Sequence, residues 1–177
     1  MPHRIILAPG ASGTVAGLRP YIKGLTARRV MAEGLALPRG SVERALPIYR
    51  AALLTADPAT TIIGGHSFGG RVASLLAAEQ PLAGLLLMSY PLHRPGHPEQ
   101  WQMRTDHWPR IECPVLLLSG ESDPFARVAL LRDAVGRLPH AELVTYPGVR
   151  HGIGPVLPDA LERIAAWVES LPPADRS

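Results

Sequence analysis

The chain has 177 residues, 46% of them hydrophobic and 19% charged, with a formal net charge of +3 at pH 7. This composition suits one globular domain, residues 1–177, that buries a single core and ends in a polar tail over 172–177. The basic residues are scattered, and their densest spot is the pair Arg28 and Arg29, so we expect no nucleic-acid partner.

The single cysteine, Cys113, allows no internal disulfide and no thiol metal site. The apolar run at the N-terminus is too short for a signal peptide, and no apolar stretch is long enough to span a membrane. We therefore expect a soluble, cytoplasmic protein without a membrane span, whose oligomeric state the sequence leaves open.

In chain order, residues 4–8 (RIILA) predict a buried strand, and apolar residues then recur at helical spacing over 15–25. Residues 30–37 suit either a strand or an irregular segment. A helix is expected from Ser41 until it is broken at 58–60 (PAT). A strand over 60–63, a helix over about 67–80 and a strand over 82–89 follow.

Residues 90–113 are rich in Pro and His and show little periodicity. A strand is predicted over 115–119, a helix after Pro124, which suits a first helical turn, a strand over 141–146 and a last helix from Leu157. Mostly apolar strands are covered on both faces, so the alternation predicts an α/β fold. We expect a doubly wound, mostly parallel sheet of about five to six strands, with ligands bound outside the carboxyl ends of the strands.

Residues 65–69 (GHSFG) fit the pattern G-x-S-x-G between a predicted strand and a predicted helix. In a nucleophile elbow the serine backbone turns abruptly and adopts a strained conformation, and the flanking glycines leave room for close packing. Ser67 is therefore the candidate nucleophile, exposed at a helix N-terminus where the dipole favours negative charge. The alternative is a small residue in a tight structural bend.

A serine hydroxyl becomes nucleophilic when a base takes its proton, and the base here is a histidine. His151 follows the last predicted strand, at the edge of the sheet where Ser67 lies. His3 and His140 precede strands, and His66 lies inside the elbow, where it is expected to point away from the serine. The remaining histidines lie in the irregular stretch: His93, His97 and His107.

The acid that orients the base is expected at Asp123, just past the strand over 115–119. Asp106 is a second choice in the loop after the neighbouring strand, and Glu121 is a weaker one. Asp123 alone also fits the cap of a helix. Three residues that each follow their own strand, in the order Ser67, Asp123, His151, favour a catalytic triad.

An oxyanion hole needs two hydrogen-bond donors. One is expected to be the backbone N–H of Phe68, directly after the nucleophile. The other is expected in the small-residue loop after the first strand, residues 8–13 (APGASG), at Ala11, with Gly10 or Ser12 as alternatives. An ordinary turn is the simpler interpretation of that loop.

With these residues assembled, the chain resembles the α/β-hydrolase superfamily over about residues 4–170. Residues 64–74 (GGHSFGGRVAS), 89–125 and 148–153 (GVRHGI) look like the KANL3/Tex30-like α/β-hydrolases, which are related to dienelactone-hydrolase-like proteins. The resemblance carries the nucleophile to Ser67, the acid to Asp123 and the base to His151. Ser67 replaces the cysteine of dienelactone hydrolases, and Pro9 stands where many relatives have a histidine.

The resemblance implies a minimal fold without a cap domain, since only residues 90–113 are available to cover the site. We expect a shallow or open substrate pocket lined by Phe68, Tyr90, Leu92, His93 and Trp101, although loop packing explains these side chains equally well. The expected function is a serine hydrolase that cleaves an ester, a thioester or a similar small acyl substrate without a cofactor. The alternative is a binding or scaffold protein on the same fold.

Overall fold

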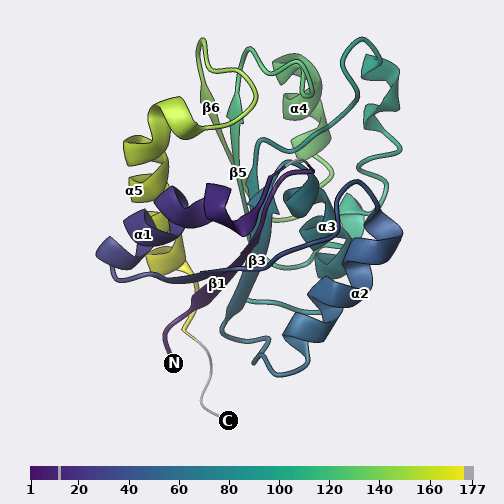
Figure 1. Cartoon of the computed structure of the whole chain (residues 1–177). Coiled ribbons are helices and arrows are strands. Elements are labelled where there is room, and N and C mark those ends of the chain that lie inside the picture. The colour runs from purple at the N-terminus through teal and green to yellow at the C-terminus, as the bar shows by residue number, and fades with distance from the viewer. Residues whose placement is uncertain (12, 174–177) are drawn as a thin grey trace.

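The computed structural model describes residues 1–11 and 13–173 of the chain. One six-stranded parallel sheet runs through the centre of the molecule in the order β2-β1-β3-β4-β5-β6 (Figure 1). The strands are β1 (Arg4–Ala8), β2 (Met31–Gly34), β3 (Thr61–His66), β4 (Gly84–Met88), β5 (Val115–Gly120) and β6 (Ala141–Tyr146). The predicted α/β fold is confirmed, with six strands.

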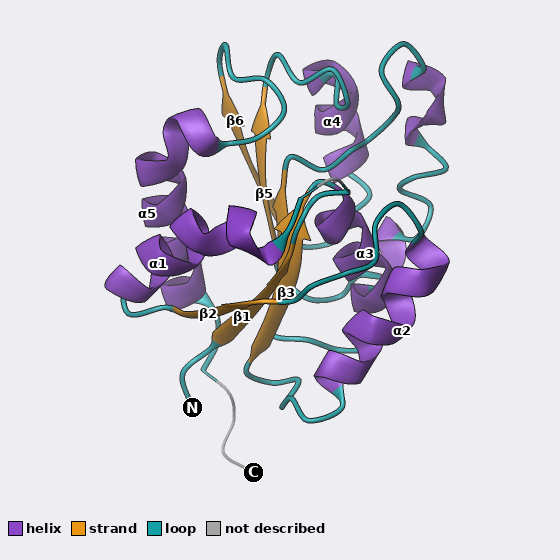
Figure 2. Cartoon of the chain, viewed as in Figure 1, coloured by secondary structure: helices purple, strands orange, loops and turns teal. Residues whose placement is uncertain are grey.

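Helices cover both faces of the sheet (Figure 2). One face carries α1 (Arg19–Ala27) and α5 (Leu157–Ser170), and the other carries α2 (Val42–Leu53), α3 (Phe68–Ala77) and α4 (Val128–Val135). Each side encloses its own apolar core. Every residue of β4 and β5 is buried, because both faces of these central strands are covered.

The segment over 30–37, ambiguous in the sequence, contains an edge strand. In β2, exposed and half-buried residues alternate, which is the pattern of a strand at the border of a sheet. Its pairing with β1 extends from Met31 to Gly34. An edge strand lacks the continuous apolar run of the central strands, so its sequence signal is weak.

The helix expected after Pro124 begins later, at Val128. The carboxylate of Asp123 accepts a hydrogen bond from the backbone N–H of Phe125 at 2.8 Å, and the N–H of Ala126 donates to the Asp123 carbonyl. Aspartate side chains form such local turns in competition with helix, which explains the delayed start. This turn fixes the Asp123 side chain at the end of β5.

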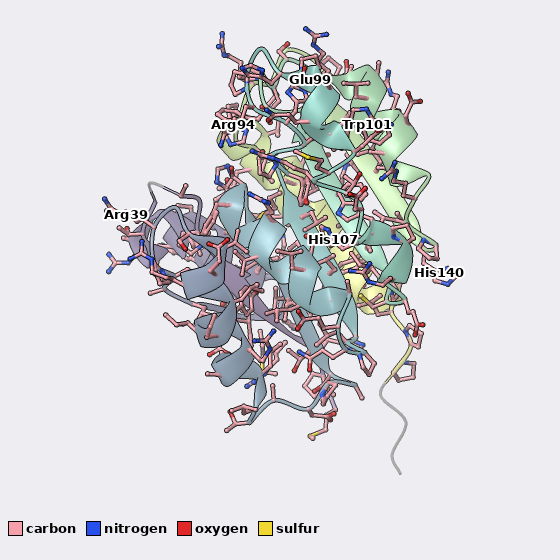
Figure 3. All side chains as sticks on the ribbon, turned by 90° about the vertical axis from the view of Figure 1, so that its right-hand side faces the viewer. Arg39, Arg94, Glu99, Trp101, His107 and His140 are labelled. Atoms are coloured by element: carbon pink, nitrogen blue, oxygen red, sulfur yellow. The ribbon has the colours of Figure 1, made fainter. Side chains whose placement is uncertain are left out.

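Residues 90–113 form an irregular segment with two short 3₁₀ turns, Pro98–Trp101 and Trp108–Arg110. His107 of this segment lies within hydrogen-bond distance of Ser74 in α3. Figure 3 shows Glu99 and Trp101 near the upper edge of this side of the molecule, with His107 lower down. No separate cap domain is present in the part of the chain that the structure describes. The loops that follow the strands therefore form the surface at the carboxyl ends of the strands.

Candidate active site

Ser67 lies between β3 and α3 with φ of 49° and ψ of −113°. A positive φ is costly for a residue with a side chain and is maintained only where the surroundings enforce it. Here the Ser67 N–H donates to the carbonyl of Met88 at 2.8 Å, which extends the pairing of β3 with β4 into the turn. The sequence prediction of a strained serine between strand and helix agrees with this backbone.

The glycines on either side of the serine are required by close backbone contacts. A Cβ added to Gly65 would lie 2.4 Å from the carbonyl oxygen of Ala8, and one added to Gly69 would lie 2.3 Å from the same atom. Both distances are far inside van der Waals contact with rigid backbone. The end of β1 and the elbow therefore pack together only because both positions lack a side chain.

Ser67, His151 and Asp123 form one hydrogen-bonded chain. The Ser67 Oγ lies 2.9 Å from Nε2 of His151, and Nδ1 of His151 lies 2.8 Å from Oδ2 of Asp123. An ionised carboxylate only accepts hydrogen bonds, so Nδ1 carries the proton and Nε2 is left to accept from the serine hydroxyl. This is the tautomer that a general base needs.

The Asp123 carboxylate is shielded from solvent, with its side chain 0% exposed. Its two oxygens have separate partners, since Oδ1 accepts from the N–H of Phe125 and Oδ2 accepts from His151. The helix-cap alternative and the catalytic one are thus compatible, because one carboxylate makes both contacts. A carboxylate fixed at both oxygens holds the histidine ring in one orientation.

The two alternative acids have other partners. Asp106 pairs with the guanidinium of Arg137 at 3.3 Å. Glu121 pairs with Arg132 at 3.3 Å and accepts from the hydroxyl of Thr145 at 2.7 Å. Neither carboxylate is among the hydrogen-bond partners of His151, whose Nδ1 contacts Asp123.

The ring of His151 packs between two other rings. Phe125 lies on one side, with ring centroids 4.5 Å apart, and His66 lies at a centroid distance of 5.2 Å. Burial lowers the pKa of His66 to about 4, and the nearby His151 contributes in the same direction. His66 is therefore neutral at physiological pH and leaves the charge of the site to the triad.

Sequence reasoning assigned no role to either of these neighbours. His66 was expected to point away from the serine, whereas its ring reaches the triad histidine and the loop after β1: a Cβ on Gly10 would lie 2.9 Å from His66 Nδ1. The position of His66 directly before the nucleophile was the available signal. Phe125 lies two residues after the acid, so its spacing from Asp123 was the corresponding clue.

Hydrogen bonds on both sides of His151 fix its loop. The N–H of Gly152 donates to the hydroxyl of Ser89 at 3.0 Å, and the N–H of Ser122 donates to the carbonyl of Val149 at 2.9 Å. Ser89 follows β4, is fully buried and has a φ of 51°. A second strained serine thus supports the base from the strand next to the nucleophile.

Of the residues considered as oxyanion donors, Phe68 and Gly10 lie beside Ser67. Phe68 is the first residue of α3, so its N–H has no acceptor within the helix. Gly10 approaches closely, since a Cβ there would be 3.7 Å from the Cβ of Ser67. Ala11, the expected second donor, follows in the same loop and is exposed, whereas Ser12 lies outside the described residues.

The expected substrate contacts from the 90–113 segment are mostly buried. Tyr90, Leu92 and His93 are 2%, 0% and 1% exposed. The Tyr90 hydroxyl donates to the carbonyl of Arg104, while His93 contacts the Arg94 carbonyl through Nδ1 and accepts from the N–H of Arg127 through Nε2. These three side chains hold the segment against the sheet and offer almost no surface to a bound molecule.

The two other expected contacts differ from each other. Trp101 is half-buried and packs under the guanidinium of Arg137, which lies 4.7 Å from the ring centroid. The Phe68 side chain is 9% exposed and belongs to the core beneath α3. Loop and core packing therefore accounts for the contacts of both side chains.

Within residues 1–11 and 13–173, no group of three or more His, Cys, Asp and Glu side chains is arranged to hold a metal ion. The described helices also include none that is both long and apolar enough to cross a membrane. Cys113 is buried, and burial raises the pKa of its thiol to about 11.

The sequence profile of the alpha/beta hydrolase domain matches residues 32–156, which is more than half of the chain and includes all three residues of the hydrogen-bonded chain. The chain belongs to the α/β-hydrolase family. The six-stranded parallel sheet with helices on both faces agrees with this membership.

Several solved structures have a fold similar to that of this chain. A monoacylglycerol lipase from Paleococcus ferrophilus has 15% identity and a TM-score of 0.78, with 96% of each chain covered. A chain from the structural work on LipS and LipT, two metagenome-derived lipolytic enzymes, has 15% identity and a TM-score of 0.75, with 96% of this chain and 95% of that chain covered. The haloalkane dehalogenase DbeA from Bradyrhizobium elkani has 13% identity and a TM-score of 0.74, with 95% of this chain and 90% of that chain covered. At such identities the likeness shows the fold alone.

Proposed function

We propose that the protein is a serine hydrolase that cleaves an ester, a thioester or a similar acyl compound through Ser67, His151 and Asp123. The observation that carries the proposal is the continuous hydrogen bonding from the serine hydroxyl through His151 to a fully shielded carboxylate, at 2.9 and 2.8 Å. The lipolytic enzymes among the similar structures support the same reaction class. The KANL3/Tex30-like resemblance remains part of this proposal.

In the first half of the reaction, Ser67 Oγ attacks the carbonyl carbon of the substrate while His151 Nε2 takes the hydroxyl proton. The carbonyl π bond becomes an oxyanion, which the N–H groups of Phe68 and of Ala11 or Gly10 stabilise. When the intermediate collapses, the bond to the leaving group breaks and His151 returns the proton to it. The product is an acyl-enzyme on Ser67.

In the second half, a water molecule takes the place of the leaving group. His151 Nε2 removes a proton from the water as its oxygen attacks the acyl carbon, and the same proton then goes to Ser67 Oγ as the ester bond breaks. Asp123 stabilises the imidazolium that forms in both halves and keeps Nδ1 protonated. The reaction consumes one water molecule and releases a carboxylic acid.

A fluorophosphonate probe, which phosphonylates an activated serine, tests the proposal. We expect the folded protein to be labelled and Ser67→Ala to lose the label. Ser122→Ala is the matched control, because Ser122 is an exposed serine next to the acid, and this variant should be labelled like the wild type. Failure to label the folded wild-type protein would instead favour a binding or scaffold protein on a hydrolase fold.

A further inference from the structure

The base of the proposed triad lies on a loop, so its ring needs support from neighbouring side chains. His151 follows β6 in a segment without helix or strand. Its ring has two hydrogen bonds, one between Nδ1 and Asp123 and one between Nε2 and Ser67. Because hydrogen bonds tolerate a range of angles, these two fix the nitrogens more firmly than the tilt of the ring. A tilted ring aims the Nε2 lone pair away from the serine hydroxyl.

Two other rings restrict that tilt. The Phe125 ring is inclined by 40° to the ring of His151 at a centroid distance of 4.5 Å, and the His66 ring by 57° at 5.2 Å. His66 is the last residue of β3 and pairs with Met88 of β4, whereas Phe125 lies in the turn after β5. Strands hold a side chain more firmly than loops do, so His66 provides the fixed support.

The His66 ring also approaches two glycines, one in each of the loops that complete the site. A Cβ on Gly10 would lie 2.9 Å from Nδ1 of His66, and a Cβ on Gly152 would lie 3.7 Å from its Nε2. Gly10 belongs to the loop in which the second oxyanion donor is expected, and Gly152 directly follows the base. The ring therefore lies beside both loops, and its size limits how closely each approaches.

The charge state of His66 suits a position beside the base. His151 becomes an imidazolium during the proposed reaction, and a second positive charge on a ring centred 5.2 Å away would oppose this step. Burial lowers the pKa of His66 to about 4, with His151 acting in the same direction and Asp123 acting against it. His66 is therefore neutral at physiological pH.

We propose that His66 is a positioning residue of the triad, whose neutral ring holds the ring of His151 in line with Ser67 and beside the loop after β1. His66 acts through His151 and transfers no proton itself. The proposal rests on the serine hydrolase function and deepens it, because it gives a role to the residue directly before the nucleophile.

Three substitutions at His66 separate the ring from its nitrogens. A shift of about 1 Å in a catalytic group costs up to about 10²-fold in rate, so His66→Ala should lower kcat about tenfold with KM nearly unchanged. His66→Gln is neutral and polar but has no ring, and it should lose as much. His66→Phe restores a ring and should keep kcat within about threefold of the wild type. A hollow of about 170 Å³ next to His66 leaves space for the larger ring.

The matched control is His107→Ala. Burial also lowers the pKa of His107 to about 4, and its ring is within hydrogen-bond distance of Ser74 in α3. This variant loses a neutral imidazole from another part of the fold, so its kcat should stay within about twofold of the wild type. The assays are kcat and KM for p-nitrophenyl butyrate and the rate of fluorophosphonate labelling. Thermal unfolding verifies that each variant is folded.

A double-mutant cycle with Phe125→Ala gives a second measurement. The backbone N–H of residue 125 still donates to Asp123 in that variant, so the acid keeps its contact. Loss of either supporting ring already frees the ring of His151. The double variant should therefore lose at least about threefold less activity than the product of the two single losses, whereas independent losses would multiply.

The outcomes separate the positioning role from the reaction. If the wild type is labelled at Ser67 but His66→Ala keeps its kcat, or loses no more than His107→Ala, the positioning role is wrong and the hydrolase stands. A loss confined to KM, rescue by Gln but not by Phe, or strictly multiplicative losses in the cycle also overturn it. If the folded wild type is neither labelled nor active on any ester, the proposed function and the positioning role fail together.

Discussion

Replacing Asp123 by Asn changes one atom of the carboxylate and tests the whole chain of hydrogen bonds. The amide oxygen of the new side chain can still accept from the N–H of Phe125, so the turn after β5 keeps its contact. The amide nitrogen then faces Nδ1 of His151, where the carboxylate oxygen now lies at 2.8 Å. Because an amide N–H donates, Nδ1 must accept and the ring proton moves to Nε2.

A histidine protonated at Nε2 cannot take the proton of Ser67, whose Oγ lies 2.9 Å from that atom. The same substitution in other Ser-His-Asp triads lowers kcat by about 10⁴, and we expect a loss of that order here. Such a loss corresponds to about 5.4 kcal/mol of activation free energy. The melting temperature should change little, since the contact with Phe125 survives.

The assay is kcat for p-nitrophenyl butyrate, read together with thermal unfolding. Asp123→Ala should lose as much activity and also about 1–3 kcal/mol of unfolding free energy, because the N–H of Phe125 loses its acceptor. Asp106→Asn and Glu121→Gln are the controls and should stay within about twofold of the wild type, since their carboxylates pair elsewhere. An Asp123→Asn protein that retains more than a tenth of the wild-type kcat would refute the assigned acid.

Three other predictions concern residues outside the triad. Gly65→Ala forces a Cβ to 2.4 Å from a β1 carbonyl, and we expect a loss of about 1–3 kcal/mol in unfolding free energy, measured by urea denaturation. Ser89→Ala removes the acceptor of the Gly152 N–H, so kcat should fall severalfold with KM nearly unchanged. A rise in KM as large as the fall in kcat would contradict this prediction. Burial lowers the pKa of His66 and His107 from 6.5 to about 4. Between these two pH values the histidines bind protons in the unfolded chain but not in the folded chain. Stability should therefore decrease as the pH falls from about 6.5 to about 4, and replacing either histidine by Gln should flatten this slope in pH-dependent melting curves.

The fold and the main chain of the elbow were predictable because their signals are local. Five of the strands correspond to short apolar runs, and the glycines around Ser67 occupy fixed positions in the sequence. The end of each parallel strand lies at one edge of the sheet, so chain order alone brought Ser67, Asp123 and His151 to the same place. Their hydrogen bonds agree with that prediction, and their catalytic role stays a proposal.

The substrate side was not predictable from local pattern. The burial of His93 depends on the N–H of Arg127, and that of Tyr90 depends on the carbonyl of Arg104. The contact of the His66 ring with His151 was missed for the same reason, because it joins residues from two distant segments of the chain. Such contacts join residues distant in sequence, and periodicity carries no information about them.

The site is held by four neighbouring strand ends, which explains how a small sheet without a cap domain supports it. The nucleophile follows β3, Ser89 follows β4, the turn with Asp123 follows β5, and the loop of His151 follows β6. The Ser67 N–H donates to the Met88 carbonyl and the Ser122 N–H donates to the Val149 carbonyl, so these hydrogen bonds join adjacent strand ends. The Gly152 N–H reaches past β5 to the hydroxyl of Ser89. The register of the parallel sheet therefore helps to fix the distances between the reacting groups. The strained backbone at Ser67 and at Ser89 persists because these bonds enforce it. The distances between the reacting groups at this edge therefore depend on strand pairing.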